Sequence, residues 1–404
     1  MTNSSRLWWE RDDIHYTPDG VLQFGGQTLI DFVQSSGTPT YIYNMDRLRS
    51  NIERLWYALD SKDIRFKIFF AIKANRHHAI LTYMRTLGRS GIDACSPGEL
   101  LLARQMGFKE EEICYTSTSV SNADIDCLAK HPNVWVNCDS LSSLRRLGQR
   151  CPGRAIGLRI NPQVGAGYTE DMTYAGDKTT KFGLYPDQFE EALDIAKTYN
   201  MSVKTLHFHI GSGYLTPQIG KLDEALERSS WFLDQCPEVD TFDIGGGLGL
   251  PLVEGEAPMD VEAWSQIVAK HAKARDLTIY VEPGDYLVKD TAVLLLEVNT
   301  VEAKMDTTFI GVNGGFNIQN SYVYYDTPFI VAPLVKDPTA PTSTVTIAGN
   351  INESIDLLAK DIQLPPIAEG DYLALLNVGG YGAATSSNHC SRGTFSEYIL
   401  WPEA

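Results

Sequence analysis

The chain has 404 residues, of which 43% are hydrophobic and 21% charged, the balance of an ordinary globular protein. Its 34 basic and 51 acidic residues give a net charge of −17, which argues against nucleic acid or an anionic membrane as the main partner. The amino terminus lacks an apolar core of signal-peptide length, and no run reaches the about 18 apolar residues of a membrane span, so we expect a cytoplasmic protein. The seven cysteines form no CxxC pair, which predicts reduced thiols and no metal site.

The first 36 residues include a β-like segment at 20–26, which we expect to pair with a later β domain. From about residue 65 onward, short apolar runs alternate with amphipathic helical stretches. The expected strands are 65–71, 91–94, 113–115, 134–137, 155–160, 205–209, 241–244 and 278–281. The helical patterns between them include 97–106, 123–129, 187–199, 222–235 and 261–275. This alternation over about 220 residues indicates an α/β fold, a parallel (β/α)₈ barrel that we place at 37–290.

The pattern changes after about residue 290, where β-rich runs are joined by turns. These runs, at 291–298, 308–311, 344–348 and 372–376, predict an antiparallel β domain. We expect a sandwich or a small barrel, formed by 291–404 together with 1–36. Prolines at positions 333, 338 and 341 predict an exposed loop.

Lys73 directly follows the first expected strand, in the run FFAIKAN at 69–75. A lysine is rarely buried without a partner. Two interpretations are therefore open. Lys73 anchors a structural salt bridge, or its amine is placed in an apolar setting for chemistry on a carbonyl group.

Polar residues also occupy the ends of other expected strands. They are Asp93 after the second strand, Arg159 near the end of the fifth, His209 in the run HFHIGSG at 207–213 after the sixth, the run DIGGG at 243–247 after the seventh, and Glu282 after the eighth. The active site of a (β/α)₈ barrel lies at the carboxyl ends of its strands. We therefore expect these residues and Lys73 to gather at one mouth of the barrel.

The triple glycine Gly245, Gly246 and Gly247 has two interpretations of its own. Consecutive N–H groups of glycines can hold an oxyanion, and barrels often bind phosphate with the loops after strands seven and eight. Ser212 would add a hydroxyl. A plain flexible turn is the alternative.

His209 and Glu282 also have structural interpretations, as a core histidine bonded to a carbonyl and as a strand-end carboxylate. However, an amine, an anion site, an imidazole and an acid at one mouth are what pyridoxal phosphate requires. That cofactor needs a Schiff-base lysine, a phosphate site and an acid that keeps its pyridine nitrogen protonated.

These residues resemble the fold-type III pyridoxal-phosphate decarboxylases, the family of diaminopimelate decarboxylase and eukaryotic ornithine decarboxylase, which share the alanine racemase-like barrel. The resemblance covers nearly the whole chain, from 37–43 to 386–388, and its motifs are specific in combination. FAIKAN at 70–75 is similar to the family's lysine motif, and HFHIGS at 207–212 is similar to its histidine motif. RINP at 159–162 and KFG at 181–183 resemble the diaminopimelate branch.

The resemblance implies a role for each catalytic residue. Lys73 would bind the cofactor covalently, His209 would stack on its ring, and Glu282 would pair with its ring nitrogen. The set that holds the cofactor would be Lys73, Asp93, Arg159, His209, Ser212, Gly245, Gly246, Gly247, Glu282 and Tyr381. The family forms a head-to-tail homodimer with two shared active sites, and 352–356 is similar to the segment that the partner subunit contributes.

The chain departs from this family where the substrate binds. Asn352 stands at the position of a cysteine that returns a proton to the substrate, and an amide is not a useful acid near neutral pH. Asp285 and Asn320 stand where diaminopimelate decarboxylases have arginines that grip the substrate's distal carboxylate. Tyr324 and Glu353 of the same pocket are retained.

We therefore expect a decarboxylase that removes the α-carboxylate of an unusual amino acid or amino-acid conjugate, not of diaminopimelate itself. A specialised pathway for a siderophore, an antibiotic or a modified peptide would supply such a substrate. Two alternatives stay open. One is a catalytically degenerate homologue that binds or regulates another protein, and the other is an amino-acid racemase, although racemases of this fold place an arginine where this chain has Glu282.

Overall fold

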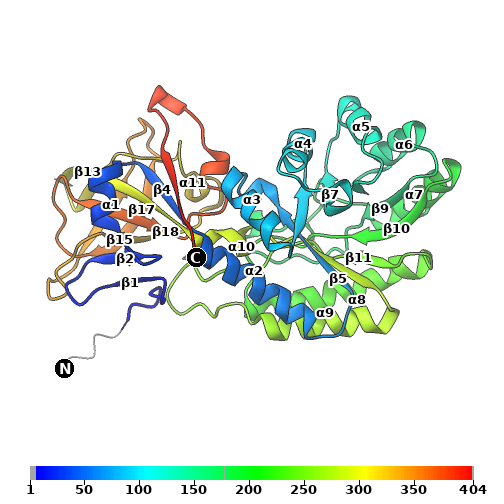
Figure 1. The fold of residues 1–404 in the computed structure, drawn as a ribbon, viewed down its shortest axis with the longest axis horizontal. Coiled ribbons are helices and arrows are strands. Elements are labelled where there is room, and N and C mark those ends of the chain that lie inside the picture. The colour runs from blue at the N-terminus through cyan, green and yellow to red at the C-terminus, as the bar shows by residue number, and fades with distance from the viewer. Residues whose placement is uncertain (1–5, 177, 403–404) are drawn as a thin grey trace. The chain divides into compact units, whose positions relative to one another are not determined.

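The computed structural model describes residues 6–176 and 178–402, which form two compact units (Figure 1). We call residues 51–250 and 257–287 the barrel unit. The described residues of 6–50, 251–256 and 288–402 form the β unit.

The barrel unit contains a closed parallel barrel in which each strand pairs with the next and the last pairs with the first. Its strands are β5 (Phe66–Ala71), β6 (Gly91–Ala94), β7 (Ile113–Ser117), β8 (Trp135–Cys138), β9 (Ala155–Arg159), β10 (Ser202–His207), β11 (Thr241–Asp243) and β12 (Thr278–Val281). The helices between them are α3 (His78–Leu87), α4 (Pro97–Gln105), α5 (Asn122–Ala129), α6 (Leu141–Arg150), α7 (Pro186–Thr198), α8 (Ile219–Gln235) and α9 (Val261–Arg275). The predicted (β/α)₈ barrel is confirmed.

Short polar caps connect the strand ends to the helices that follow them. Ser96, Ser121, Ser140 and Asp260 each accept a hydrogen bond from the backbone N–H three residues further on. These caps satisfy amide groups that the first helical turn leaves without partners. Ser96, Ser121 and Ser140 follow their strands within four residues, so these three helices begin close to the carboxyl ends of the strands, where the mouth of the barrel forms.

The sixth barrel strand differs from its prediction. We expected it at 205–209, but β10 spans Ser202–His207 and His209 lies beyond it. The alternation of polar and apolar residues continues past the strand, because Phe208 and Ile210 are buried although the ladder has ended. His209 is therefore presented by a loop rather than by a strand.

The β unit is built around a sheet with the order β15-β18-β13-β14-β16-β17, to which β4 and β19 are added through β13. These strands are β4 (Thr40–Asn44), β13 (Ala292–Lys304), β14 (Thr307–Val312), β15 (Ile330–Pro333), β16 (Ser343–Ala348), β17 (Leu357–Leu364), β18 (Tyr372–Leu376) and β19 (Ser396–Leu400). Most pairs are antiparallel, as predicted, but β14 pairs in parallel with β16, and β4 with β19. Parallel pairs need long connections, and about 30 residues, including helix α11 (Ser321–Tyr325), join β14 to β16.

The amino-terminal segment belongs to the β unit. Strands β1 (Ile14–Tyr16), β2 (Leu22–Phe24) and β3 (Gln27–Thr28) form a small sheet, followed by helix α1 (Leu29–Ser36). Ile14, Leu22 and Phe24 share a core with Val293 and Leu295 of β13.

The segment 37–50, which we placed in the barrel, also lies in the β unit. Strand β4 is buried along its whole length between β13 and β19, so its apolar side chains are satisfied in that sheet. Helix α2 (Met45–Asp60) spans the boundary between the units at residues 50 and 51. Residues 334–342, which include most of the predicted proline loop, carry no helix or strand.

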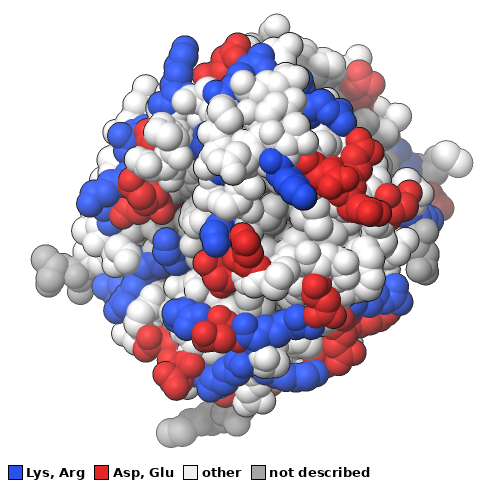
Figure 2. All heavy atoms as spheres, turned by 90° about the vertical axis from the view of Figure 1, so that its right-hand side faces the viewer, with Lys and Arg blue, Asp and Glu red and all other residues white. Residues whose placement is uncertain are grey.

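The surface of the protein carries charges of both signs. Figure 2 shows acidic and basic side chains interleaved over one face. Ion pairs such as Arg145–Glu191 and Lys270–Asp223 join neighbouring barrel helices and are largely exposed, so each adds little stability. Within the described chain, every helix is too short or too polar to cross a bilayer.

Candidate active site at the carboxyl end of the barrel

Six groups predicted for the site follow or end strands of the barrel unit. Lys73 lies in a 3₁₀ turn after β5, Asp93 in β6, Arg159 at the end of β9, His209 after β10, the triple glycine after β11 and Glu282 after β12. The strands are parallel and form a closed barrel, so their carboxyl ends meet at one mouth.

Lys73 is an exposed side chain flanked by buried neighbours, Ile72 and Ala74. Its charge acts on other members of the group. Burial and the Glu282 charge raise the pKa of Asp93 well above its usual value, and the Lys73 ammonium opposes that rise. Burial, followed by the Lys73 and Arg159 charges, lowers the pKa of His209 well below its usual value. The Lys73 amine therefore lies within electrostatic reach of Asp93 and His209.

Glu282 is buried and accepts a hydrogen bond from His207, with 3.0 Å between its Oε2 and the imidazole Nε2. Burial alone would favour the neutral acid. The contacts with His207 and Asp243 and the charge of Lys73 outweigh that effect and lower the pKa of Glu282 to about 2. Glu282 is therefore an ionised carboxylate in a nearly dry environment, the property required of a partner for a protonated ring nitrogen.

A polar network surrounds Glu282 inside the barrel. The Thr116 hydroxyl lies 3.5 Å from Glu282 Oε1, and the Cys114 thiol lies 3.6 Å from the same oxygen. Asn137 donates its amide to Thr116 at 2.9 Å and approaches Asp243 Oδ2 at 3.5 Å. Burial, and then the Glu282 charge, raise the pKa of Cys114 well above its usual value, so it remains a thiol and a weak donor.

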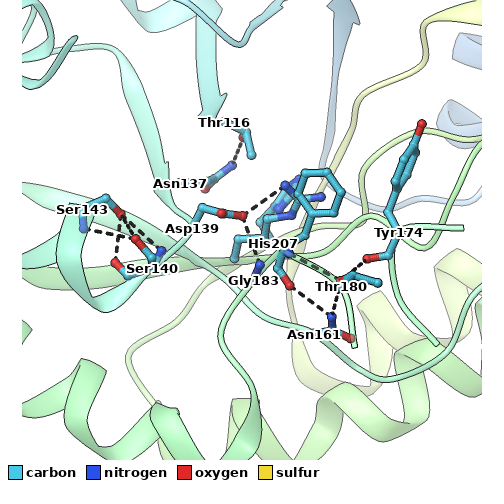
Figure 3. Close-up of polar contacts among 12 residues, drawn as sticks. Thr116, Asn137, Asp139, Ser140, Ser143, Asn161, Tyr174, Thr180, Gly183 and His207 are labelled. Atoms are coloured by element: carbon cyan, nitrogen blue, oxygen red, sulfur yellow. Dashed lines mark hydrogen bonds and ion pairs between the residues drawn. The ribbon is translucent and has the colours of Figure 1, made fainter. Parts of the chain in front are cut away.

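Arg159 is held by the carboxylate of Asp139, with 3.1 Å between Nη1 and Oδ1, and its guanidinium lies 4.4 Å from the centre of the Phe182 ring. Asp139 Oδ1 also accepts the Gly183 N–H at 3.1 Å (Figure 3). The 181–183 motif therefore folds onto Arg159 and buries it.

His209 stacks against Tyr174, with 5.0 Å between ring centres and 29° between planes. Thr180 donates to the Tyr174 carbonyl at 3.1 Å, and Asn161 donates to Thr180 at 3.2 Å, which ties this loop to the end of β9 (Figure 3). The His209 Nδ1 atom is buried and has no hydrogen-bond partner within the described chain. Tyr174 therefore fixes the plane of the imidazole, and the structure leaves one ring nitrogen for another group.

The glycine turn after β11 has the geometry of an anion site. Gly245 and Gly247 have φ angles of +65° and +101°, which side-chain-bearing residues rarely adopt. A Cβ at Gly247 would lie 2.1 Å from the Gly211 carbonyl oxygen. The N–H groups of Gly246 and Gly247 donate to no protein acceptor in 6–176 or 178–402. These amide groups suit a ligand oxyanion.

Substitution of Gly247 by alanine is expected to weaken cofactor binding by about tenfold or more, because the turn must shift to admit the new Cβ. Titration of the apoprotein with pyridoxal phosphate, followed by absorbance, measures the affinity. Gly220→Ala on α8 is the matched control, since a Cβ there meets nothing within 4 Å. Equal affinities for the two variants would contradict the assigned site.

These observations fit pyridoxal phosphate. The glycine turn would hold its phosphate, and Ser212 lies nearby, since Gly211 packs against Gly247. Lys73 would supply an amine, and Glu282 would supply an ionised acid for the ring nitrogen. The unpartnered buried atoms, Asp93 Oδ1 and His209 Nδ1, are what a polar ligand would satisfy.

The predicted substrate residues other than Asp285 belong to the β unit, as does Tyr381. Asn320 is buried and bonded to Thr385, whereas Tyr324, Asn352 and Glu353 are exposed. Asp356 ties the 352–356 segment to the rest of the unit, since its carboxylate accepts from Phe316 N–H at 2.8 Å and from Ile351 N–H at 2.7 Å.

Tyr381 has a left-handed backbone with φ of +54°, and its carbonyl accepts the Thr385 hydroxyl at 2.5 Å. Asp285 begins helix α10 (Asp285–Val288) in the chain that follows Glu282. The roles assigned to these residues stay predictions.

Comparison with known proteins identifies the family. The model of the pyridoxal-dependent decarboxylase pyridoxal-binding domain matches residues 49–289, more than half of the chain. The diaminopimelate decarboxylase of Methanothermobacter thermautotrophicus is 34% identical, covering 96% of this chain and 92% of the relative. That of Escherichia coli K12 is 28% identical, covering 93% and 91%.

Solved structures agree with the sequence comparison. Diaminopimelate decarboxylase from Helicobacter pylori, complexed with L-lysine, has a TM-score of 0.84 and 26% identity, covering 93% of this chain and 95% of that one. The enzyme from M. jannaschii, in co-complex with L-lysine, has a TM-score of 0.87, with 96% and 93% covered, and at 24% identity it supports the fold alone. The chain therefore belongs to the pyridoxal-dependent decarboxylase family. It is a pyridoxal-phosphate-dependent amino-acid decarboxylase, that is, a carboxy-lyase.

Sequence reasoning missed the residues that surround Glu282. His207, Asp243, Cys114 and Asn137 lie on four different barrel strands and point to one place only because the barrel closes. The available signal was a polar residue on an otherwise apolar strand, as at Asp243 in TFDI. Tyr174 gave no signal, because it lies in an irregular loop.

Proposed function

We propose that this enzyme removes the α-carboxylate of an amino acid whose distal end is not a free carboxylate. The observation that carries the proposal is the environment of Asn320. By family resemblance this position holds an arginine that grips a distal carboxylate. Here it holds a neutral amide that is already engaged.

Asn320 is 6% exposed, and both ends of its amide contact one residue. Its Nδ2 donates to the Thr385 carbonyl at 3.0 Å, and its Oδ1 accepts the Thr385 hydroxyl at 2.9 Å. A group engaged in this way has little capacity left for a substrate. Its contacts favour a structural role, holding the 383–385 turn.

Asp285 stands at the position of the second arginine. An acid there repels a distal carboxylate and favours an amine or a guanidine. Loss of the two bidentate arginine contacts removes about 1.5–3 kcal/mol of binding free energy for a distal carboxylate per charge-assisted bond. Together the two positions disfavour diaminopimelate.

The chemistry follows from the residues at the barrel mouth. When bound, pyridoxal phosphate supplies an electron sink for the pair of electrons that remains when the carboxylate leaves as CO₂. Lys73 would hold the cofactor through its side-chain amine. Glu282 keeps the ring nitrogen protonated, His209 orients the ring, and the glycine turn anchors the phosphate.

A proton must return to the α-carbon after CO₂ leaves. Asn352 cannot supply it, because an amide is not an acid near neutral pH. His209 is also a poor donor, since burial and nearby cations keep its imidazole neutral. Water or another group of the partner subunit is the donor that fits.

We also propose the shared-site homodimer of the family. The 352–356 segment supports it, since Asn352 and Glu353 are exposed and Ile355 is 56% exposed. Tyr324 is exposed by 66%. Ile355 and Tyr324 are thus apolar side chains that a partner subunit would cover. Light scattering of the purified protein measures the oligomeric state.

The substrate is tested by CO₂ release from purified enzyme loaded with pyridoxal phosphate. The panel contains diaminopimelate, its distal carboxamide, and basic amino acids with amine or guanidine ends. We expect kcat/KM to be higher for one of the last two classes than for diaminopimelate. Diaminopimelate is the second candidate substrate, because relatives up to 34% identical are diaminopimelate decarboxylases. If diaminopimelate were the best substrate in the panel, the proposed specificity would be wrong.

Substitution of Asn320 by arginine is expected to raise kcat/KM for diaminopimelate by about 10- to 100-fold, the effect of restoring one charge-assisted contact. Asn320→Gln, which adds length without charge, is the matched control. No gain from arginine over glutamine would show that this position does not control the distal group.

A further inference from the structure

Three carboxyl groups lie close together inside the barrel. Asp93, Asp243 and Glu282 are 3%, 0% and 8% exposed. One oxygen of Asp243, one of Glu282 and the Cys114 sulfur all lie within 4.8 Å of one another. Two buried carboxylates at this distance repel each other, which favours one proton held by the pair over two full negative charges.

His207 does not supply the missing positive charge. Its Nε2 donates to Glu282, whereas its Nδ1 is buried and has no hydrogen-bond partner in the described chain. An imidazolium would leave a second N–H buried without an acceptor, so His207 is the neutral tautomer with its proton on Nε2. Burial lowers its pKa, in agreement, although Glu282 opposes that shift.

The hydrogen bonds decide which acid keeps the proton. Glu282 accepts from His207 at 3.0 Å and has Thr116 and Cys114 close to its other oxygen. Asp243 has one good donor, the Gly245 N–H at 3.0 Å to Oδ1. Its Oδ2 has only Asn137 at 3.5 Å and Cys114 at 3.8 Å. The ionised form is thus better solvated at Glu282, which leaves the proton to Asp243.

We infer that Asp243 is a neutral carboxylic acid in the working enzyme and acts as a positioning residue, donating its proton to Glu282 so that Glu282 stays ionised. This inference rests on the proposed pairing of Glu282 with the cofactor's ring nitrogen. Without the donated proton, a second negative charge would face Glu282, and Glu282 would itself bind a proton and lose its attraction for the ring. Burial, and then the Glu282 charge, raises the pKa of Asp243 well above its usual value, which agrees.

The other titratable groups around Asp243 come from every neighbouring strand. Asp93 on β6 brings a third acid to the cluster, and burial and the Glu282 charge raise its pKa well above the usual value as well. Cys114 on β7 and Tyr280 on β12 are neutral, since burial raises the pKa of each, to about 12 for Tyr280. Lys73, which follows β5, is the nearby cation, and its charge acts on Asp93 and Glu282.

The first test compares the thermal stability of wild-type and Asp243→Asn apoproteins as a function of pH. The pKa of Asp243 in the folded protein is raised above its unfolded value of about 3.9. The contribution of Asp243 to the free energy of unfolding is therefore most favourable below about pH 3.9, and it is lost as the pH rises through the folded-state pKa. Asparagine does not titrate. We expect the melting temperature of the variant, relative to wild type, to increase steadily from pH 4 toward alkaline pH. A difference that does not change with pH would overturn the inference.

The second test compares Asp243→Asn with Asp243→Ala in pyridoxal phosphate binding, followed by absorbance. The amide keeps a donor to Glu282 and should hold the cofactor within about threefold of wild type, whereas alanine should weaken binding by about 10- to 100-fold. Equal losses in both variants would refute the donor role. Both tests are independent of the substrate, so their failure is distinct from failure of the proposed specificity.

If the asparagine variant does not fold, isotope-edited infrared spectroscopy of aspartate-labelled protein replaces it. The Asp93→Asn variant removes the other buried aspartic acid near Glu282. We expect the Asp93→Asn variant to retain the carbonyl band of a protonated, buried aspartic acid at neutral pH. Absence of this band would overturn the inference.

Discussion

Lys73→Ala is expected to abolish decarboxylation and, with it, the absorbance band of the lysine-bound cofactor that borohydride removes. Lys73 follows β5 at the barrel mouth, and its charge reaches Asp93, His209 and Glu282. Without the amine, the cofactor has no covalent anchor and no leaving group for exchange with the substrate. We expect kcat to fall by about 10³-fold or more, in the upper part of the range for loss of one acid–base group.

Lys67→Ala is the matched control for this experiment. Lys67 lies on the same strand, is exposed, and its ammonium is 5.4 Å from the centre of the Tyr280 ring. Loss of this contact should change stability by less than about 1 kcal/mol and leave the absorbance band in place. Turnover by Lys73→Ala at the level of Lys67→Ala would contradict the assigned role of Lys73.

Glu282→Gln is expected to lower kcat by about 10²- to 10⁴-fold, because the cofactor's ring nitrogen loses the carboxylate that keeps it protonated. The amide is nearly the same shape as the acid, so the contact with His207 can persist and the change isolates the charge. Because the pKa of Glu282 is held below its usual value, this residue is ionised in the wild-type enzyme at neutral pH.

Steady-state kinetics across pH, together with the spectrum of the bound cofactor, measure both effects. Glu111→Gln is the control, since Glu111 is an exposed acid in the turn before β7. If Glu282→Gln kept wild-type kcat, the electron-sink role of Glu282 would be wrong.

The barrel could be predicted because the sequence patterns that specify its strands and helices are local. Each strand is a short apolar run, and the polar residue that follows it, such as Lys73 or Glu282, marks the mouth. The prediction of β12 at 278–281 matches the structure, since the run TIYV consists of β-branched and aromatic residues and is followed by Glu282, Pro283 and Gly284.

The remaining features depend on contacts between distant segments. Residues 40–44 form an apolar run that could serve any sheet, and only its pairing with β13, about 250 residues away, places it in the β unit. The parallel pairing of β14 with β16 is likewise a matter of topology. Asp243 and His207 were visible as residues, but their relation to Glu282 depends on closure of the barrel.

Peptide mapping of the holoenzyme tests the central claim most directly. The protein is loaded with pyridoxal phosphate, reduced with borohydride, digested with trypsin and analysed by mass spectrometry. We predict that the reduced cofactor is found on Lys73, in a peptide covering 68–76 that trypsin does not cleave at the modified lysine. Cofactor attached to a different lysine, or to none, would contradict it.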